Sequence, residues 1–176
     1  LEAFQRVAIE TSSILEIIGD GVLRQALEAQ TAHLKLSNSV MFSGWLSQPP
    51  CAAKLRQADV MVLPSLRECG GAVVLEAMAV GLPVIATNWG GPADYLNSTC
   101  GILVEPSSKE AFINQLTDAM LKLANSANLR HEMGCAGQER VRQHFDWERK
   151  VDEIMEVYSG AAGKSIQKEA IVSTAT

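Results

Sequence analysis

The stretch VMVLPSLRECGGAVVLEAMAVGLPVIAT, residues 60–87, decides the fold of this chain. It contains two short apolar runs, 60–63 and 84–86, whose length and β-branched content favour buried strands. Between them an apolar segment, 72–80, ends at Gly81, a residue type that commonly follows the last turn of a helix. A strand, a helix and a second strand in this order form the crossover unit from which parallel sheets are built.

The same alternation continues on both sides of this stretch. Apolar runs predict further strands at 14–18, 40–42 and 102–104. Helical patterns occur at 2–11, 22–34, 51–57 and 127–143, and in two further helices that begin near Ser107 and Asp146. This order predicts an α/β fold, a Rossmann-like parallel sheet with helices on both faces.

The two further helices have recognisable starts. Ser107 and Glu110 fit a capping box, and Asp146 fits the N-cap of the last helix. That helix carries an apolar stripe at helical spacing, formed by Trp147, Val151, Ile154, Met155 and Tyr158. The apolar period is lost after this stripe, so we expect one domain over residues 1–159 and a disordered tail over 160–176.

Composition narrows the class of protein. With 176 residues, 47% of them hydrophobic and 20% charged, the chain is typical of one globular domain. The net charge of −5 argues against a sequence-independent nucleic-acid binder, so no nucleic-acid partner is expected. The four cysteines form no CxxC pair, and no apolar run is long enough to span a bilayer. We expect a cytoplasmic protein, free or peripheral at the inner face of the membrane, with no metal site.

The glycine-rich segments that follow the predicted strands are the places to look for chemistry. Ligands of open α/β sheets bind outside the carboxyl ends of the strands. Three such segments lie at 19–21, 70–71 and 90–91. Glycine lets a ligand approach the backbone closely, and the amino terminus of a helix supplies unpaired N–H groups and partial positive charge. A phosphate group is the ligand that suits this combination.

Two carboxylates flank the second glycine-rich segment. Glu68 precedes it, and Glu76 lies about two turns into the following helix, on an otherwise apolar stretch. The Glu76 side chain leans back toward the amino terminus of its helix. A carboxylate buried there needs partners, and two sugar hydroxyls would satisfy it. A lone glutamate in a helix is usually only solvated, but the Glu-x7-Glu spacing together with the glycine pairs favours a binding site.

The chain contains an ordered set of motifs. The set comprises LPS at 63–65, Glu68-x7-Glu76 followed by AMAxGxPVIAT at 77–87, IIGDGVLR at 17–24, VMFSGW at 40–45, GGPAD at 90–94 and GILVEP at 101–106. This set resembles the family 4 glycosyltransferases, also described as glycosyl transferase group 1. The run FDWE at 145–148 resembles the start of the last helix of the family. The resemblance extends over residues 1–158.

The resemblance implies a GT-B architecture, in which two Rossmann-like domains face a cleft, with this chain as the C-terminal, donor-binding half. It implies hexosyl-type transfer from a UDP-, GDP- or ADP-sugar with retention at the anomeric carbon. The acceptor, a glycan, a lipid or a small molecule, would bind through the N-terminal domain. It also implies catalysis without a metal or another cofactor, because amides, a helix dipole and basic side chains would stabilise the leaving diphosphate.

The resemblance also assigns roles to individual residues. Glu68 would contact the donor sugar as the catalytic carboxylate, and Glu76 would hold the ribose hydroxyls. The amides of Gly71 and Ala72 would contact the distal phosphate or the sugar. Trp45 lies where the base pocket forms, unless it is a plain core residue. The remaining donor-binding positions are Gly19, Gly21, Gly70 and Leu75.

Two features depart from the family pattern. Cys69 and Gly70 stand where the family has an aromatic and a small residue, which changes the expected shape of the sugar pocket. The first strand of the domain, the basic residues that clamp the diphosphate and the N-terminal domain would all precede Leu1. The isolated chain is therefore expected not to catalyse transfer.

Other functions fit parts of the pattern. A nucleotide-sugar epimerase of GT-B fold would turn over its substrate without an acceptor, and a non-catalytic nucleotide-binding fragment would transfer nothing. A flavodoxin-like receiver domain would need acidic residues clustered after the first strand, which this sequence lacks. Trp89 either lines the cleft or packs beneath it.

Overall fold

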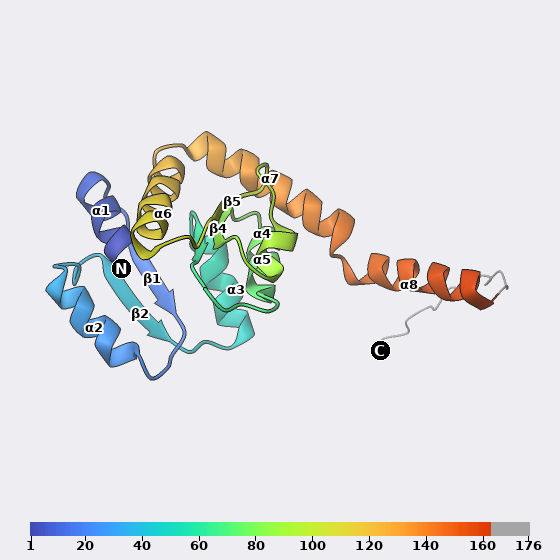
Figure 1. The fold of residues 1–176 in the computed structure, drawn as a ribbon, viewed down its shortest axis with the longest axis horizontal. Coiled ribbons are helices and arrows are strands. Elements are labelled where there is room, and N and C mark those ends of the chain that lie inside the picture. The colour runs from blue at the N-terminus through green and yellow to red at the C-terminus, as the bar shows by residue number, and fades with distance from the viewer. Residues whose placement is uncertain (163–176) are drawn as a thin grey trace.

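The computed structural model describes residues 1–162, which form eight helices and five strands (Figure 1). Helices and strands alternate as far as the fifth strand, and three helices then follow in succession. The strands are β1 Leu15–Ile18, β2 Val40–Gly44, β3 Met61–Leu63, β4 Val84–Thr87 and β5 Gly101–Val104. The helices are α1 Glu2–Glu10, α2 Arg24–His33, α3 Gln48–Gln57, α4 Ala72–Ala79, α5 Gly91–Tyr95, α6 Lys109–Ala124, α7 Ala127–His144 and α8 Trp147–Ala162. Of the predicted tail, residues 160–162 continue α8, and residues 163–176 lie outside the described part of the chain.

All five strands pair in parallel, as the sequence predicts, and they form two sheets. In the first sheet β1 pairs with β2, so that Leu15 lies opposite Val40. In the second sheet β4 lies between β3 and β5, so that Val84 lies opposite both Met61 and Gly101. No backbone ladder joins β1 to β3 within residues 1–162. The predicted α/β fold is confirmed, whereas the predicted single sheet is interrupted between β1 and β3.

Helices cover both faces of the sheets, as predicted. Ile85 of β4 belongs to a core cluster with residues of α1 and α6, on what we call the α6 face. Its neighbour Val84 belongs to a different cluster with Leu55 of α3 and Met78 of α4, on what we call the α4 face. Successive residues of a strand point to opposite faces, so the two clusters lie on opposite sides of the sheet.

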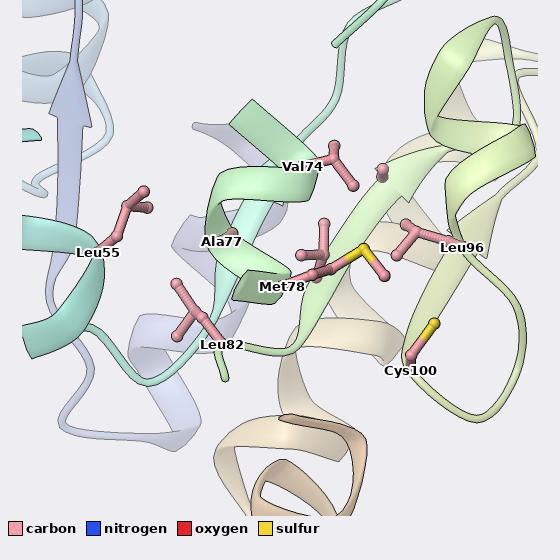
Figure 2. Packing of buried hydrophobic residues seen from close by; sticks show 9 residues of the cluster. Leu55, Val74, Ala77, Met78, Leu82, Leu96 and Cys100 are labelled. Carbon is pink, nitrogen blue, oxygen red and sulfur yellow. The ribbon is translucent and has the colours of Figure 1, made fainter. Parts of the chain in front are cut away.

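The core of the α4 face is built on α4 itself. Val74, Ala77 and Met78 are fully buried. Figure 2 shows the Met78 side chain reaching from α4 toward Leu96, with Val74 and Leu82 on either side of it. Burying a side chain of this size contributes roughly 1.5–3 kcal/mol to stability. These contacts fix the position of α4 and therefore of its amino terminus.

Contacts on both faces hold the two sheets in place relative to each other. Phe4 and Val7 of α1 pack against β1 and β2, while Ala3 of the same helix belongs to the cluster beneath β4 and β5. On the opposite face, Lys54 of α3 forms an ion pair with Glu16 of β1, with Nζ 2.8 Å from Oε1. Contacts on both faces of the sheets therefore bridge the break between β1 and β3.

The structure corrects one predicted cap and adds one helix. Ser108, not Ser107, caps α6, because its hydroxyl accepts a backbone N–H of the first turn at 3.2 Å. The predicted capping box of Ser107 with Glu110 is therefore wrong. Asp146 does cap α8, since its carboxylate accepts a backbone N–H at 3.0 Å. The short α5 was not predicted, because five residues are too few to show a helical period.

Helix α8 projects away from the body of the protein (Figure 1). Its predicted apolar stripe is exposed, and Trp147 at its start is 78% exposed. None of the described helices has the combination of length and apolar character that crossing a membrane requires.

The close packing of α7 against the turn after α4 gives a test of the fold. A Cβ on Gly134 would lie 2.0 Å from the carbonyl oxygen of Gly81. We expect Gly134→Ala to lower the free energy of unfolding by about 1–3 kcal/mol, as forced overpacking does, in urea titrations followed by circular dichroism. Gly160→Ala in α8 is the matched control, because a Cβ there meets nothing within 4 Å. Equal stabilities of the two variants would contradict this packing.

The ion pair between Glu16 and Lys54 gives the stability a dependence on pH. Hydrogen bonds from Lys54 and from Ser43 lower the pKa of Glu16 below its usual value of 4.5. The carboxylate therefore stabilises the fold fully above pH 4.5, and this contribution is lost as the pH falls through the lower pKa of the folded state. We expect Glu16→Gln to flatten the decline of the urea midpoint between about pH 5 and pH 3. Glu10→Gln, at the exposed end of α1, is the control. If the urea midpoint declined with pH equally in the wild-type protein, Glu16→Gln and Glu10→Gln, the ion pair would make no such contribution.

Candidate functional site

The order of the strands reverses at the break between the two sheets. From β1 the chain moves to β2, and from β3 it moves through β4 to β5. Figure 1 shows β1 nearer than β2 to the second sheet, so the two halves run outward from the break in opposite directions. Ligands of α/β sheets bind in the crevice at such a point, outside the carboxyl ends of the strands. We call residues 64–71, after β3, the glutamate loop, and residues 88–91, after β4, the glycine-pair loop.

The amino terminus of α4 lies on one side of the break. Its N-cap residue is Gly71, in the left-handed conformation with φ of 64°, which has no side chain to close the helix end. The carboxylate of Glu68 does so instead and accepts the N–H of Gly71 at 2.9 Å. The partial positive charge of the helix end favours this carboxylate, and it would favour a phosphate oxygen for the same reason. The structure thus brings Glu68 and Gly71 into direct contact.

The glutamate loop and the glycine-pair loop touch through their backbones. The N–H of Gly91 donates to the carbonyl of Cys69 at 3.0 Å. A Cβ on Gly90 would lie 2.0 Å from the carbonyl oxygen of Glu68, and a Cβ on Gly91 would lie 2.0 Å from that of Gly70. Only glycine fits at positions 90 and 91, which explains the second glycine pair found in the sequence.

Glu76 is exposed, which corrects the expectation that it is buried among apolar neighbours. Positions 74, 77 and 78 of α4 face the core, and this leaves Glu76 on the outer side of the helix together with Ala72, one turn earlier. Leu75 is partly buried and packs against the core. The Glu76 carboxylate and the open end of α4 therefore share one side of the helix.

The predicted glycines on the other side of the break border a separate hollow. This hollow, of about 380 Å³, lies between β1, β2 and α2, and Gly19, Gly21 and the ring of Phe42 line it. The N–H of Gly19 donates to the carbonyl of Gly44 at 2.7 Å, which fixes the turn at the end of β1. The turn is therefore held in place by the neighbouring strand.

The structure brings the predicted site residues together as two groups. Trp45, just after β2, is 75% exposed, so it is not a core residue. Glu68, Gly71 and Glu76 do not line the hollow around Gly19. One group thus follows β1 and β2, and the other surrounds the amino terminus of α4.

The charged residues directly after β1 are paired with each other. Arg24 contacts Glu28 at 2.9 Å and Asp20 at 3.4 Å, and these carboxylates raise the pKa of Arg24. Within residues 1–162, no three His, Cys, Asp or Glu side chains are grouped as a metal ion would require. At the end of α4, the backbone N–H of Gly71 is already directed at an anion, the Glu68 carboxylate.

The structure defines the surroundings of Pro92 and Trp89, which flank the glycine pair. Pro92, which the sequence reasoning missed as a site residue, packs its ring 3.0 Å from where a Cβ on Gly71 would stand. The signal was the proline directly after the glycine pair, since proline is frequent in the first turn of a helix. Trp89 is 56% exposed, so it does not pack beneath the cleft.

Comparison with known proteins agrees with this geometry. The sequence model of the family described as "Glycosyl transferases group 1" matches residues 1–140. The N-acetyl-alpha-D-glucosaminyl L-malate synthase of Bacillus anthracis is 30% identical over 159 residues, which are 90% of this chain and 40% of that protein. The chain spans well under half the length of the curated relatives that it matches.

Solved structures extend the comparison to the fold. The C-terminal domain of LpcC, a glycosyl transferase group 1 family protein from Francisella tularensis, matches with a TM-score of 0.70 and 26% identity, over 83% of this chain and 79% of that chain. HepE of Anabaena, solved with UDP and glucose, matches with a TM-score of 0.75 and 22% identity, over 90% of this chain and 44% of that chain. The fold is that of a Rossmann-like half of a GT-B glycosyltransferase. Because the family model covers most of its length, this chain belongs to the glycosyl transferase group 1 family.

Proposed function

We propose that this chain is the donor-binding half of a retaining family 4 glycosyltransferase, which transfers a hexosyl group from a nucleotide sugar. The observation that carries the proposal is the hydrogen bond between Glu68 and the N–H of Gly71, beside the point where the strand order reverses. It places a donor for phosphate and an acceptor for hydroxyls next to each other. A nucleotide sugar presents a phosphate and sugar hydroxyls side by side, so it complements both groups.

The distal phosphate would bind at the first turn of α4. The N–H groups of Gly71, Ala72 and Val73 lie at the end of the helix, where no preceding turn supplies carbonyl partners. Glu68 occupies the N–H of Gly71 in the unliganded protein, so its carboxylate must give way when a phosphate binds. Repulsion between the two anions would then turn Glu68 toward the adjoining sugar. During transfer, the aligned N–H groups would stabilise the charge that develops on the leaving diphosphate.

The nucleoside would extend from α4 toward the first sheet. Glu76, on the outer side of α4, would accept the ribose hydroxyls, and Trp45 would contact the base of a UDP-, GDP- or ADP-sugar. HepE was solved with UDP and glucose, which supports a donor of this class. The acceptor, a glycan, a lipid or a small molecule, would bind through a separate N-terminal domain. We place the enzyme in the cytoplasm, since all four of its cysteines are free.

We also propose that a further strand, joined to the amino end of α1, lies in the break. Helix α2, which connects β1 to β2, lies on the α6 face, because Leu27 shares a hollow with Ile17 and Phe42, which also pack near α1. Parallel crossovers are right-handed in nearly all proteins. The connection from the proposed strand through α1 to β1 runs over this same face. It must therefore cross the sheet in the same direction as the connection from β1 to β2. The proposed strand would then lie next to β1 on the side opposite β2, in the break.

The backbone at the break supports this additional strand. Leu15 of β1 and Met61 of β3 donate their N–H groups away from the break. The alternate residues Glu16 and Val62 therefore direct their N–H and C=O groups into it. A strand paired with both edges would give the order 3-2-1-4-5-6 of a Rossmann sheet, and its carboxyl end would lie between the two groups of site residues.

The ribose assignment is tested by removing the Glu76 carboxylate from the full-length enzyme. We expect Glu76→Ala to weaken binding of the nucleoside diphosphate by about tenfold or more, because each charge-assisted hydrogen bond contributes roughly 1.5–3 kcal/mol. The loss should be the same for the nucleotide sugar, since both contain the ribose. Titration calorimetry measures it, with UDP, GDP and ADP compared. Glu110→Ala, an exposed glutamate of α6, is the control, and unchanged affinity for Glu76→Ala would remove the assignment.

Glu68 should behave differently from Glu76. We expect Glu68→Ala to keep or raise the affinity for the nucleoside diphosphate, because it frees the N–H of Gly71 and removes a competing negative charge. Turnover of the full-length enzyme should fall by roughly a hundredfold, the usual effect of losing one hydrogen bond that acts in the transition state. Equal losses of nucleotide affinity in the two variants would contradict this division of roles. Turnover of the nucleotide sugar without any acceptor would favour an epimerase.

A further inference from the structure

Trp89 is exposed at the carboxyl end of β4. Its side chain is 56% exposed, whereas Thr87, two residues earlier, is 1% exposed. A tryptophan that leaves more than half of its surface in water contributes little of its large apolar area to the core. Tryptophan is enriched where proteins contact other molecules, because it combines a large apolar ring with a polar N–H group.

The backbone on both sides of Trp89 is fixed. Before it, Asn88 donates its N–H to the carbonyl of Val104 in β5 at 2.8 Å. After it, Gly90 packs against the carbonyl of Glu68, with no room for a Cβ. The indole is therefore carried on a rigid turn, one residue away from the contact with the glutamate loop. Because the backbone of this turn is already fixed, ligand binding does not have to pay the entropic cost of ordering it.

The position of Trp89 along the sheet edge corresponds to one end of a nucleotide sugar. Across the carboxyl ends of the strands, Trp45 follows β2, Gly19 follows β1, Glu68 follows β3 and Trp89 follows β4. A nucleotide sugar is linear, with base, ribose, diphosphate and sugar in that order. If the diphosphate lies at the end of α4 and the base lies toward Trp45, the sugar lies toward Trp89.

The chemistry of Glu68 and Trp89 matches the two kinds of surface on a sugar. A pyranose has hydroxyls at its rim and C–H groups on its faces. A carboxylate accepts the hydroxyls, and the electron-rich face of an indole attracts C–H groups. We propose that Trp89 is an aromatic platform for the transferred sugar, against which one face of the ring packs while Glu68 accepts its hydroxyls. This inference rests on the proposed donor-binding function.

The platform is tested by fluorine NMR on the full-length enzyme labelled with 5-fluorotryptophan. Trp→Phe variants assign the resonances of Trp45, Trp89 and Trp147. We expect the Trp89 resonance to shift with UDP-glucose, GDP-mannose or ADP-glucose and to stay unchanged with the corresponding nucleoside diphosphate. Trp147, in the projecting helix α8, is the internal reference and should not shift with either ligand.

Affinities provide a second readout. We expect Trp89→Ala to weaken binding of the nucleotide sugar between about twofold and tenfold, the usual effect of one aromatic contact, without changing the affinity for the nucleoside diphosphate. Trp89→Phe should retain most of the affinity, because it keeps an aromatic face. Trp147→Phe is the matched control.

Each outcome decides between the two proposals. A Trp89 resonance that shifts equally with nucleotide and nucleotide sugar would overturn the platform. A Trp89 resonance that does not shift with the nucleotide sugar, while the Trp45 resonance does, would also overturn the platform. The donor-binding function would still hold in that case. If none of the three nucleoside diphosphates or their nucleotide sugars bound to the full-length enzyme, the donor-binding function itself would be rejected, and the platform with it.

Discussion

The backbone contact between the glutamate loop and the glycine-pair loop is the constraint on which the rest of the site depends. These loops leave neighbouring strands and approach so closely that positions 90 and 91 have no room for a side chain. The contact sets where Glu68 stands relative to the end of α4. Because Val74 and Met78 anchor that helix in the core, the loops cannot separate without disturbing buried packing. Stability and site geometry are thus coupled through the same few glycines.

The site residues that follow β1 and β2 are positioned by contacts far from the two loops. Gly19 and Trp45 directly follow the strands of the first sheet, which no backbone ladder joins to the second within the described residues. Helix α1 on one face and the ion pair of Glu16 with Lys54 on the other set the distance across the break. A ligand that contacts both groups would add its own binding energy to this connection.

Local patterns predict most of the fold, and non-local contacts account for the errors. The apolar runs predict the five strands, and the glycine-rich segments predict the loops that follow them. The prediction of Ser107 as the cap was wrong, because the path of the chain after β5 makes the adjacent Ser108 the cap. The exposure of Glu76 depends on which side of α4 meets the sheet, and the break depends on strand pairing across the chain. A single sequence contains neither kind of information in its periodicity.

The hydrogen bond of Glu68 to Gly71 also bears on how a donor differs from a spent nucleotide. Any phosphate that takes the N–H of Gly71 must displace the Glu68 carboxylate. In the proposed complex with a nucleotide sugar, the displaced carboxylate would find new donors in the sugar hydroxyls. With the nucleoside diphosphate that the proposed transfer leaves behind, it would find only water and would stand close to an additional negative charge. The internal carboxylate would therefore favour the substrate over the product at the same helix end, which helps the product to leave.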